Sequence, residues 1–276
     1  MHNDEKRSYV LYIPNIPSSI GTVKLPLVIV LHGGRLQTKS TEKTTSFSEK
    51  ADKEKFIVVY PNGSSGSPMG IKTWNVDHCC GYAMKEKKDD IGFLSTLIDT
   101  LINEQAVDPN NVFVTGMSNG GMMAHKVGME LSSKINAIAP VSSGIFVDAE
   151  PPVQTVPALI INGELDKSFP MEGGLSGGRF VDSAWDGTYL YPVRGQSEFW
   201  AENNGCSDRI TEKHLSKTLY LWKYNCPEGG MVLHYVLKDQ GHAWPGSKHR
   251  NLRGDTPSQT FDATDAIWKF FRLMMK

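Results

Sequence analysis

A serine set between glycines is the pattern in this chain that could do chemistry. The segment Gly116-Met117-Ser118-Asn119-Gly120 fits the pattern G-x-S-x-G, whose glycines allow a sharp, strained turn that exposes the serine hydroxyl. Alone the pattern is weak, since roughly one chain in ten of this length would carry it by chance. Here a short apolar run, residues 112–115, precedes it and a helix-compatible stretch, residues 120–131, follows it. That context predicts that Ser118 is a nucleophile, whereas a merely structural turn would explain the glycines but not the serine.

A serine hydroxyl reacts readily only when a neighbouring base takes its proton, so a histidine must accompany Ser118. His242 lies late in the chain, on a glycine- and proline-containing segment that follows the apolar run 231–237. We predict that His242 is this base, since a histidine with only a packing or surface role would not require that position.

A carboxylate that orients the imidazole is expected at the end of another strand. The apolar run 158–161 is followed by Glu164 and Asp166, which places both carboxylates at the carboxyl edge of a parallel sheet. We favour Asp166, with Glu164 as the alternative. The order serine, aspartate, histidine is the order of α/β-hydrolases and differs from the orders of chymotrypsin and subtilisin.

Acyl transfer also needs backbone N–H groups that stabilise the developing oxyanion. The residue after the nucleophile, Asn119, supplies one. The second is expected from His32-Gly33-Gly34-Arg35, where glycine lets the backbone approach a substrate closely. We favour Gly34 over Arg35, and we expect His32 to brace this loop by a hydrogen bond.

Other polar and aromatic residues carry weaker signals. Trp74 and Trp244 could form walls of a substrate pocket, because indoles give large flat contact areas, although core packing explains them equally well. Asp77-His78-Cys79-Cys80 could suggest a metal site, but it lacks a second pair of ligands at the usual spacing. We therefore predict no metal site.

The elements that must position these residues alternate between strand and helix along nearly the whole chain. Such alternation predicts a doubly wound, mostly parallel sheet with helices on both faces, formed by residues 1–276 as a single domain. Residues 64–88 are predicted to be a loop, and residues 164–205 an excursion near the active site. The predicted strands are 9–13, 25–31, 56–60, 112–115, 137–141, 158–161 and 231–237, and the predicted helices are 46–55, 120–131, 263–275 and one that begins near Asp89.

Composition excludes several classes of protein. The chain has 276 residues, 39% hydrophobic and 21% charged, with a formal net charge of -1. We therefore expect no nucleic-acid partner, and without an apolar run of about 18 residues we expect no membrane span. Residues 1–6 are polar and lack the apolar core of a secretory signal. Of the four cysteines, Cys206 and Cys226 have a separation that suits one loop-closing disulfide, whereas the state of Cys79 and Cys80 stays open.

Together these residues resemble the esterases that include polyhydroxybutyrate depolymerases and the feruloyl and acetylxylan esterases of carbohydrate esterase family 1. The resemblance implies an α/β-hydrolase fold, no cofactor, a small-molecule or polymeric ester substrate, and a Cys206–Cys226 disulfide. It also implies a secreted or periplasmic protein, although the polar start leaves the cytoplasm open. The segments that carry it are Leu31-His32-Gly33-Gly34, Tyr60-Pro61-Asn62-Gly63, Trp74-Asn75, Cys79-Cys80-Gly81, Asp89-Asp90-Ile91-Gly92-Phe93, Gly116-Met117-Ser118-Asn119-Gly120-Gly121, Asn204-Gly205-Cys206 and Gly241-His242-Ala243-Trp244-Pro245-Gly246.

The sequence thus predicts a serine carboxylic-ester hydrolase that works through an acyl-enzyme. The second hypothesis is a peptidase of the prolyl oligopeptidase type, which shares the order serine, aspartate, histidine. The third hypothesis is a non-catalytic binding module on a hydrolase scaffold. This hypothesis would predict the loss of a triad residue, yet serine, aspartate and histidine are all present. The acyl and alcohol groups of the substrate and the oligomeric state are left open.

Overall fold

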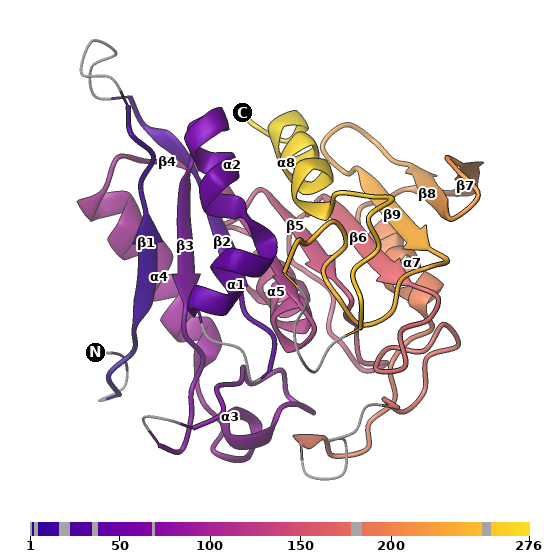
Figure 1. Cartoon of the computed structure of the whole chain (residues 1–276), viewed down its shortest axis with the longest axis horizontal. Helices are drawn as coiled ribbons and strands as arrows, with labels where there is room; N and C mark the ends of the chain where they lie inside the picture. The colour runs from indigo at the N-terminus through magenta and orange to yellow at the C-terminus, as the bar shows by residue number, and fades with distance from the viewer. Residues whose placement is uncertain are drawn as a thin grey trace.

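The structure is a computed structural model of the chain, and it describes residue 2 and residues 5–16, 23–34, 38–67, 70–177, 184–249 and 255–276. The described strands form one nine-stranded sheet in the order β1-β3-β2-β4-β5-β6-β9-β8-β7 (Figure 1). Neighbours among β2, β3, β4, β5, β6 and β9 are parallel, whereas β1, β8 and β7 pair antiparallel. The strands are β1 (Tyr9–Tyr12), β2 (Leu25–Leu31), β3 (Ile57–Pro61), β4 (Val107–Met117), β5 (Ala137–Val141), β6 (Ala158–Gly163), β7 (Ser207–His214), β8 (Leu219–Asn225) and β9 (Val232–Leu237).

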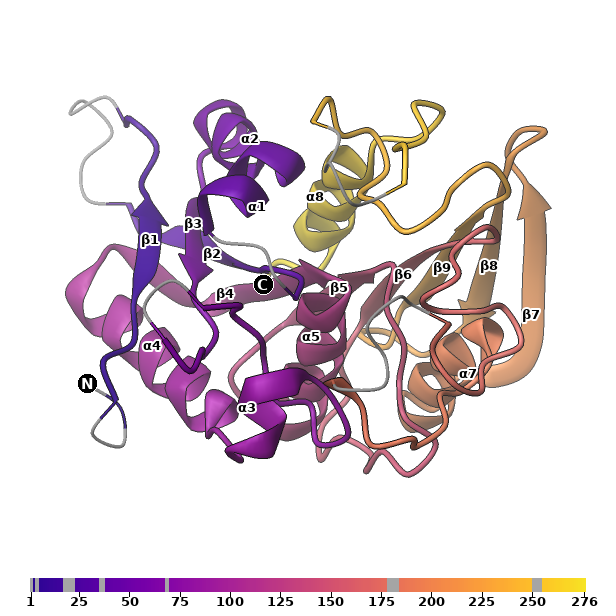
Figure 2. The same ribbon diagram turned by 60° about the horizontal axis from the view of Figure 1, so that its bottom comes forward.

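Helices cover both faces of this sheet. Figure 2 shows α1, α2 and α8 on one face and α4, α5 and α7 on the other, while α3 lies beyond the end toward which the parallel strands point. The parallel strands therefore deliver their carboxyl ends to one edge, where α3 and the long loops gather. The helices are α1 (Thr38–Thr45), α2 (Phe47–Glu54), α3 (Gly81–Lys85), α4 (Asp90–Glu104), α5 (Asn119–Glu130), α7 (Val193–Asn203) and α8 (Ala263–Leu273).

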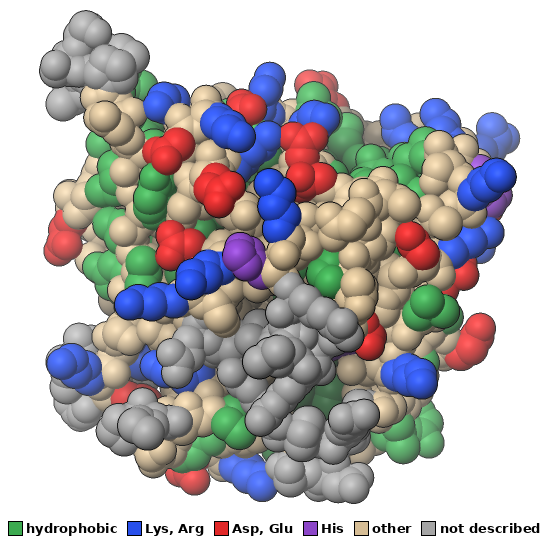
Figure 3. Space-filling model, in the orientation of Figure 1, with side chains coloured by type: hydrophobic (Ala, Val, Ile, Leu, Met, Phe, Trp, Pro, Cys, Tyr) green, Lys and Arg blue, Asp and Glu red, His purple; other side chains and the backbone are tan. Residues whose placement is uncertain are grey.

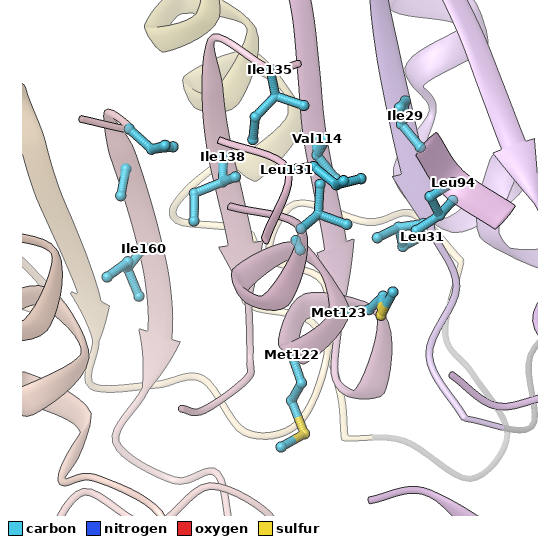
Figure 4. Close-up of a cluster of buried hydrophobic side chains, with 14 of the residues drawn as sticks. Ile29, Leu31, Leu94, Val114, Met122, Met123, Leu131, Ile135, Ile138 and Ile160 are labelled. Carbon is cyan, nitrogen blue, oxygen red and sulfur yellow. The ribbon is translucent and has the colours of Figure 1, made fainter. Parts of the chain in front are cut away.

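The apolar runs of the central strands fill two cores, one on each face. In β2, Leu27 and Ile29 belong to one core, whereas Val28 and Val30 belong to the other, and all four side chains are buried. This alternation follows from the two-residue period of a strand, and continuous apolar runs are typical of parallel strands covered on both faces. Figure 4 shows the core between α5 and the sheet, to which α5 contributes Met122 and Met123, and the strands contribute Ile29, Val114, Ile138 and Ile160.

Charged side chains of both signs are interspersed on the outer face of the helices α1, α2 and α8 (Figure 3). Lys50 of α2 pairs with Asp265 of α8 at 2.7 Å, and Arg272 of α8 pairs with Glu54 of α2 at 3.4 Å. These pairs link two helices that lie far apart in the sequence. Within the described part of the chain, no helix combines the length and the apolar character needed to cross a membrane.

The structure confirms the predicted fold class of a mostly parallel sheet with helices on both faces. The predicted strand 25–31 coincides with β2, and the predicted first strand is β1, which pairs antiparallel with β3. The helix expected to begin near Asp89 is α4, whose first turn is capped because Asp89 accepts a hydrogen bond from the N–H of Gly92 at 2.8 Å. The sequence prediction missed α1, α3, α7, β7 and β8.

Candidate active site

Ser118 lies in the turn between β4 and α5, in the conformation predicted for a nucleophile. Its backbone has φ 58° and ψ -128°, a region that non-glycine residues rarely adopt. The N–H of Ser118 donates to the carbonyl oxygens of Val141 at 3.1 Å and Ser142 at 3.2 Å, which fixes the turn against the end of β5. A Cβ added at Gly120 would collide with the carbonyl oxygens of Leu31 and His32, so the turn requires glycine there.

Three side chains from different strand ends meet at this edge. The Nε2 atom of His242 lies 3.0 Å from the Oγ atom of Ser118, and its Nδ1 atom lies 2.8 Å from Oδ2 of Asp166. A carboxylate can only accept at this site, so the tautomer with Nδ1–H leaves Nε2 free to accept the serine proton. Ser118, His242 and Asp166 thus form a continuous hydrogen-bonded relay.

The alternative acid, Glu164, faces a different partner. Its side chain is exposed, and its Oε1 atom accepts a hydrogen bond from the hydroxyl of Tyr220 at 2.9 Å. Asp166 is buried, and its second oxygen, Oδ1, accepts from the backbone N–H groups of Ser168 at 2.8 Å and Phe169 at 3.2 Å. These bonds hold the Asp166 carboxylate toward His242, and the geometry therefore favours Asp166.

The pKa of His242 reflects the balance between burial and nearby negative charge. Burial disfavours the charged imidazolium, but the charge and hydrogen bond of Asp166 and the charge of Asp255 outweigh it, so the pKa of His242 is raised. A raised pKa suits an imidazole that must hold a proton during the reaction.

Two residues that the sequence analysis missed hold the backbone on either side of His242. The buried amide of Gln240 donates through Nε2 to the carbonyl oxygens of Gly241 and Ala243, both at 3.0 Å. The carboxylate of Asp255 accepts the backbone N–H of His242 at 2.6 Å. No local pattern identifies Asp255, because it lies 13 residues from His242 in sequence and becomes its neighbour only in the fold. The partners of Gln240 are close in sequence, but a glutamine beside a glycine is not a pattern that indicates a role.

The two residues predicted to bind the oxyanion lie close to each other. Asn119 begins α5, where backbone N–H groups have no partner within the helix. Its buried side chain accepts from the N–H of Trp74 at 2.7 Å and donates to the Trp74 carbonyl at 3.0 Å. A Cβ built on Gly34 would lie 4.0 Å from the Cβ of Asn119 and 4.0 Å from Cγ2 of Thr73, so Gly34 and Asn119 lie side by side without crowding among the described residues. The other candidate, Arg35, lies outside the described residues.

His32 braces the loop that carries Gly34, as predicted. Its Nδ1 atom lies 2.8 Å from the carbonyl oxygen of Gly33, and its Nε2 atom accepts the N–H of Gly63 at 2.9 Å. Both contacts suit a neutral ring, and burial lowers the pKa of His32 to about 4, with smaller contributions from the charges of Lys72 and Arg7. His32 therefore stays uncharged at neutral pH and connects the loops that follow β2 and β3.

Of the two explanations for Trp74 and Trp244, walls of a substrate pocket or core packing, the burial of both side chains favours core packing. Both side chains are buried, with exposed fractions of 0% for Trp74 and 1% for Trp244. The indole N–H of Trp74 donates to the His32 carbonyl, and that of Trp244 donates to Thr264, both at 3.0 Å. Each indole thus buries both its apolar face and its polar atom, which is core packing.

Among the described residues, Phe169 is an aromatic residue that approaches the relay. Its ring centroid lies 5.7 Å from that of His242. Phe169 belongs to the predicted excursion, which is closed on itself by paired backbone hydrogen bonds between Gly174 and Leu190, at 3.0 and 2.8 Å. The excursion therefore brings an apolar side chain to the edge of the active site. Its second part forms the helix α7.

A second histidine fastens the excursion to neighbouring loops. The Nδ1 atom of His78 lies 2.7 Å from Asp186 and 3.0 Å from Thr188, and its Nε2 atom lies 2.9 Å from Asp148. Burial disfavours the charged ring, but hydrogen bonds and charges from Asp186 and Asp148 raise the pKa of His78. Among the described residues, no group of three or more metal-binding side chains is present.

Disulfides occur at both cysteine pairs. Cys206 and Cys226 are joined by an S–S bond of 2.07 Å that links the segment after α7 to the end of β8. Cys79 and Cys80 are joined to each other, and the peptide bond between them is cis. The described part of the chain contains no free cysteine.

A mostly parallel sheet whose strand ends carry a serine turn, an acid and a late histidine defines the α/β-hydrolase fold. Solved structures agree with this fold. An acetyl xylan esterase from Aspergillus awamori gives a TM-score of 0.59 at 15% identity, covering 88% of this chain and 91% of that chain. Esterase PE8 gives 0.56 at 18% identity, covering 96% and 99%.

Residues 7–164 match the family described as "Esterase PHB depolymerase", and the chain belongs to this family. It is 28% identical to feruloyl esterase B of Piromyces equi over 84% of this chain and 42% of that protein. It is 27% identical to the bifunctional acetylxylan esterase/xylanase XynS20E of Neocallimastix patriciarum over 79% of this chain and 29% of that protein. The chain thus spans less than half of the length of these curated relatives.

Proposed function

We propose that this chain is a serine carboxylic-ester hydrolase in which Ser118 is the nucleophile, His242 the general base and Asp166 the orienting acid. The observation that carries the proposal is the continuous relay from Ser118 through His242 to Asp166, with contacts of 3.0 and 2.8 Å. Residues 1–276 act as one catalytic domain.

The reaction proceeds in two steps through an acyl-enzyme. His242 takes the proton of Ser118 as Oγ attacks the ester carbonyl, and the backbone N–H groups of Asn119 and Gly34 stabilise the oxyanion. Collapse of the tetrahedral intermediate passes the proton from His242 to the departing alcohol. Water, deprotonated by His242, then attacks the acyl-enzyme and releases the carboxylic acid.

Feruloyl, acetyl and hydroxyalkanoate esters are the proposed substrates. The relatives support this range, because their names include feruloyl esterase, acetylxylan esterase and poly(3-hydroxybutyrate) depolymerase. The Cys206–Cys226 disulfide supports a secreted or periplasmic location, since such bonds persist mainly in oxidising compartments.

The test compares the wild type with Ser118→Ala on para-nitrophenyl acetate to octanoate, methyl ferulate, acetylated xylan and polyhydroxybutyrate. We expect Ser118→Ala to lower kcat by at least about 10⁴-fold, because the variant lacks the nucleophile. The matched control is Ser216→Ala, which changes an exposed serine between β7 and β8 and should retain full activity. Equal ester hydrolysis by the wild type and Ser118→Ala would exclude Ser118 as the nucleophile. Cleavage of prolyl peptides without ester hydrolysis would instead support the peptidase.

A further inference from the structure

A polar pocket of about 350 Å³ lies between the start of the chain and the loop after β3. Residues 5–8, residues 62–67 and Lys72 line it. The residues of the Ser118–His242–Asp166 relay do not line this pocket. The lining of the pocket is rich in serine and cationic side chains. This composition suits a small, hydroxylated anion.

Buried polar atoms without protein partners are concentrated in this lining. Among the described residues, Arg7 Nε, Asn62 Oδ1 and Ser64 Oγ are buried and accept or donate no hydrogen bond within the protein. The side chain of Arg7 is only 5% exposed, and Ser64 is 2% exposed. Buried polar groups are nearly always satisfied, so three such atoms in one pocket point to a ligand with both acceptors and donors.

The charges in the lining favour an anion as the acceptor. Arg7 is held by Asp90, with Nη2 2.6 Å from Oδ1, which leaves Nε to serve another group. Glu5 is paired with Lys88 at 3.1 Å. Lys72, half-buried in the same lining, forms no ion pair with the part of the chain that the structure describes. Burial and the charge of Arg7 lower the pKa of Lys72, and a bound anion would relieve both effects.

The pocket is connected to the active site through one pair of residues. Ser64 and Thr73 exchange backbone hydrogen bonds of 3.0 Å in both directions. Thr73 packs beside Gly34, and the next residue, Trp74, holds the side chain of Asn119. A substrate unit in the pocket would therefore lie behind the wall of the oxyanion site, at the same edge of the sheet as Ser118.

We propose that this pocket is a subsite for a hydroxylated carboxylate, namely a uronic acid unit of a polymeric ester substrate. Arg7 Nε, Ser64 Oγ and Lys72 bind the carboxylate, and Asn62 Oδ1 accepts a hydrogen bond from a sugar hydroxyl. The assignment to a substrate rests on the proposed esterase function, whereas the carboxylate site itself can be tested without it.

Binding is measured by calorimetry at low salt on the full chain carrying Ser118→Ala, with glucuronate, glucose and 3-hydroxybutyrate as probes. We expect saturable binding of glucuronate and none of glucose. Lys72→Gln and Ser64→Ala should each weaken glucuronate binding by roughly tenfold, because each removes a hydrogen bond to a charged group. Lys85→Gln, which changes an exposed lysine of α3, should leave it unchanged. Melting curves establish that each variant is folded.

Equal binding of glucose, no saturable binding of glucuronate, or no effect of Lys72→Gln would overturn the proposal. Tighter binding of 3-hydroxybutyrate than of glucuronate would overturn the polymer subsite and assign the pocket to a free product acid. In kinetics, Lys72→Gln should raise KM for acetylated xylan that carries uronic acid groups, whereas the control Lys85→Gln should leave that KM unchanged. If glucuronate binds but no ester is cleaved, the esterase function fails while the carboxylate site stands.

Discussion

Neighbouring residues fix both the imidazole ring and the backbone of His242, the proposed base. Asp166 holds the Nδ1 edge of His242, whereas Asp255 accepts its backbone N–H and adds a second negative charge. Gln240 holds the carbonyl groups before and after it. The position of the imidazole therefore depends on residues that never touch the substrate.

Replacing Asp255 by asparagine should change the pH dependence of catalysis. The protonated form of His242 cannot act as a base, so kcat/KM falls as pH decreases through its pKa. Asp255 contributes to the raised pKa, and its loss should move this acidic limb to lower pH. The asparagine oxygen can still accept the His242 N–H, so the plateau of kcat/KM should stay within about fivefold of the wild type.

The pH profile of kcat/KM for para-nitrophenyl acetate measures this shift. The matched control is Asp239→Asn, since Asp239 bonds Ser258 and does not contribute to the pKa of His242. An acidic limb that stays in place in Asp255→Asn, or that moves equally in both variants, would contradict the role given to Asp255.

At the scale of elements, the side chain of His78 is one attachment of the excursion, beside backbone hydrogen bonds such as the one from Val147 to Tyr189 at 3.1 Å. The ring lies between Asp148 and Asp186, which belong to different segments. The pKa of His78 is raised, so the stabilisation of this contact is complete below the ordinary histidine pKa and is lost as pH rises through the raised value.

Hydrogen exchange of residues 184–190, measured across that pH range, should show less protection at the alkaline end. His78→Ala should remove the pH dependence and leave the segment weakly protected throughout. A matched control is His214→Ala, because His214 pairs with Glu212 on the exposed strand β7. Protection that is independent of pH in the wild type would contradict a titrating attachment.

The Cys206–Cys226 disulfide stabilises the far edge of the sheet. It closes a loop with a sequence separation of 20 between α7 and β8. Cys206→Ser with Cys226→Ser should lower the free energy of unfolding by about 3 kcal/mol, because the unfolded chain gains entropy. Denaturant unfolding measures the change, and kcat should be retained, since this edge lies away from Ser118. An unchanged midpoint would show that the bond adds no stability.

Strong local patterns made several of these elements predictable. Continuous apolar runs identified β2 and β5, and the glycines around Ser118 identified the serine turn. By contrast, Ser207–His214 is largely polar because β7 is an edge strand, so its sequence resembles a loop. Trp74 and Trp244 were left with two alternatives because sequence does not reveal whether an indole faces a cleft or a core.

At the scale of the whole molecule, the two cores share the same strands. Val28 and Ile29 are neighbours in β2 yet pack into opposite cores, so neither core can form without the sheet. We therefore expect one cooperative unfolding transition for the chain, as for a single domain. Calorimetry with the disulfides intact should give equal calorimetric and van't Hoff enthalpies. Two separated transitions would contradict the single-domain proposal.

The paired hydrogen bonds between Gly174 and Leu190 bring the two stems of the excursion together. The chain between these stems leaves and rejoins the fold at one point, and it is also attached to His78 through Asp186 and Thr188. A change in its length that keeps those contacts should therefore leave β6 and α7 in place. The fold thereby separates the catalytic residues from a segment, between Gly174 and Leu190, that can vary beside them. Related enzymes could differ in the length and sequence of that segment, and a protein engineer could insert a different segment between the same two stems.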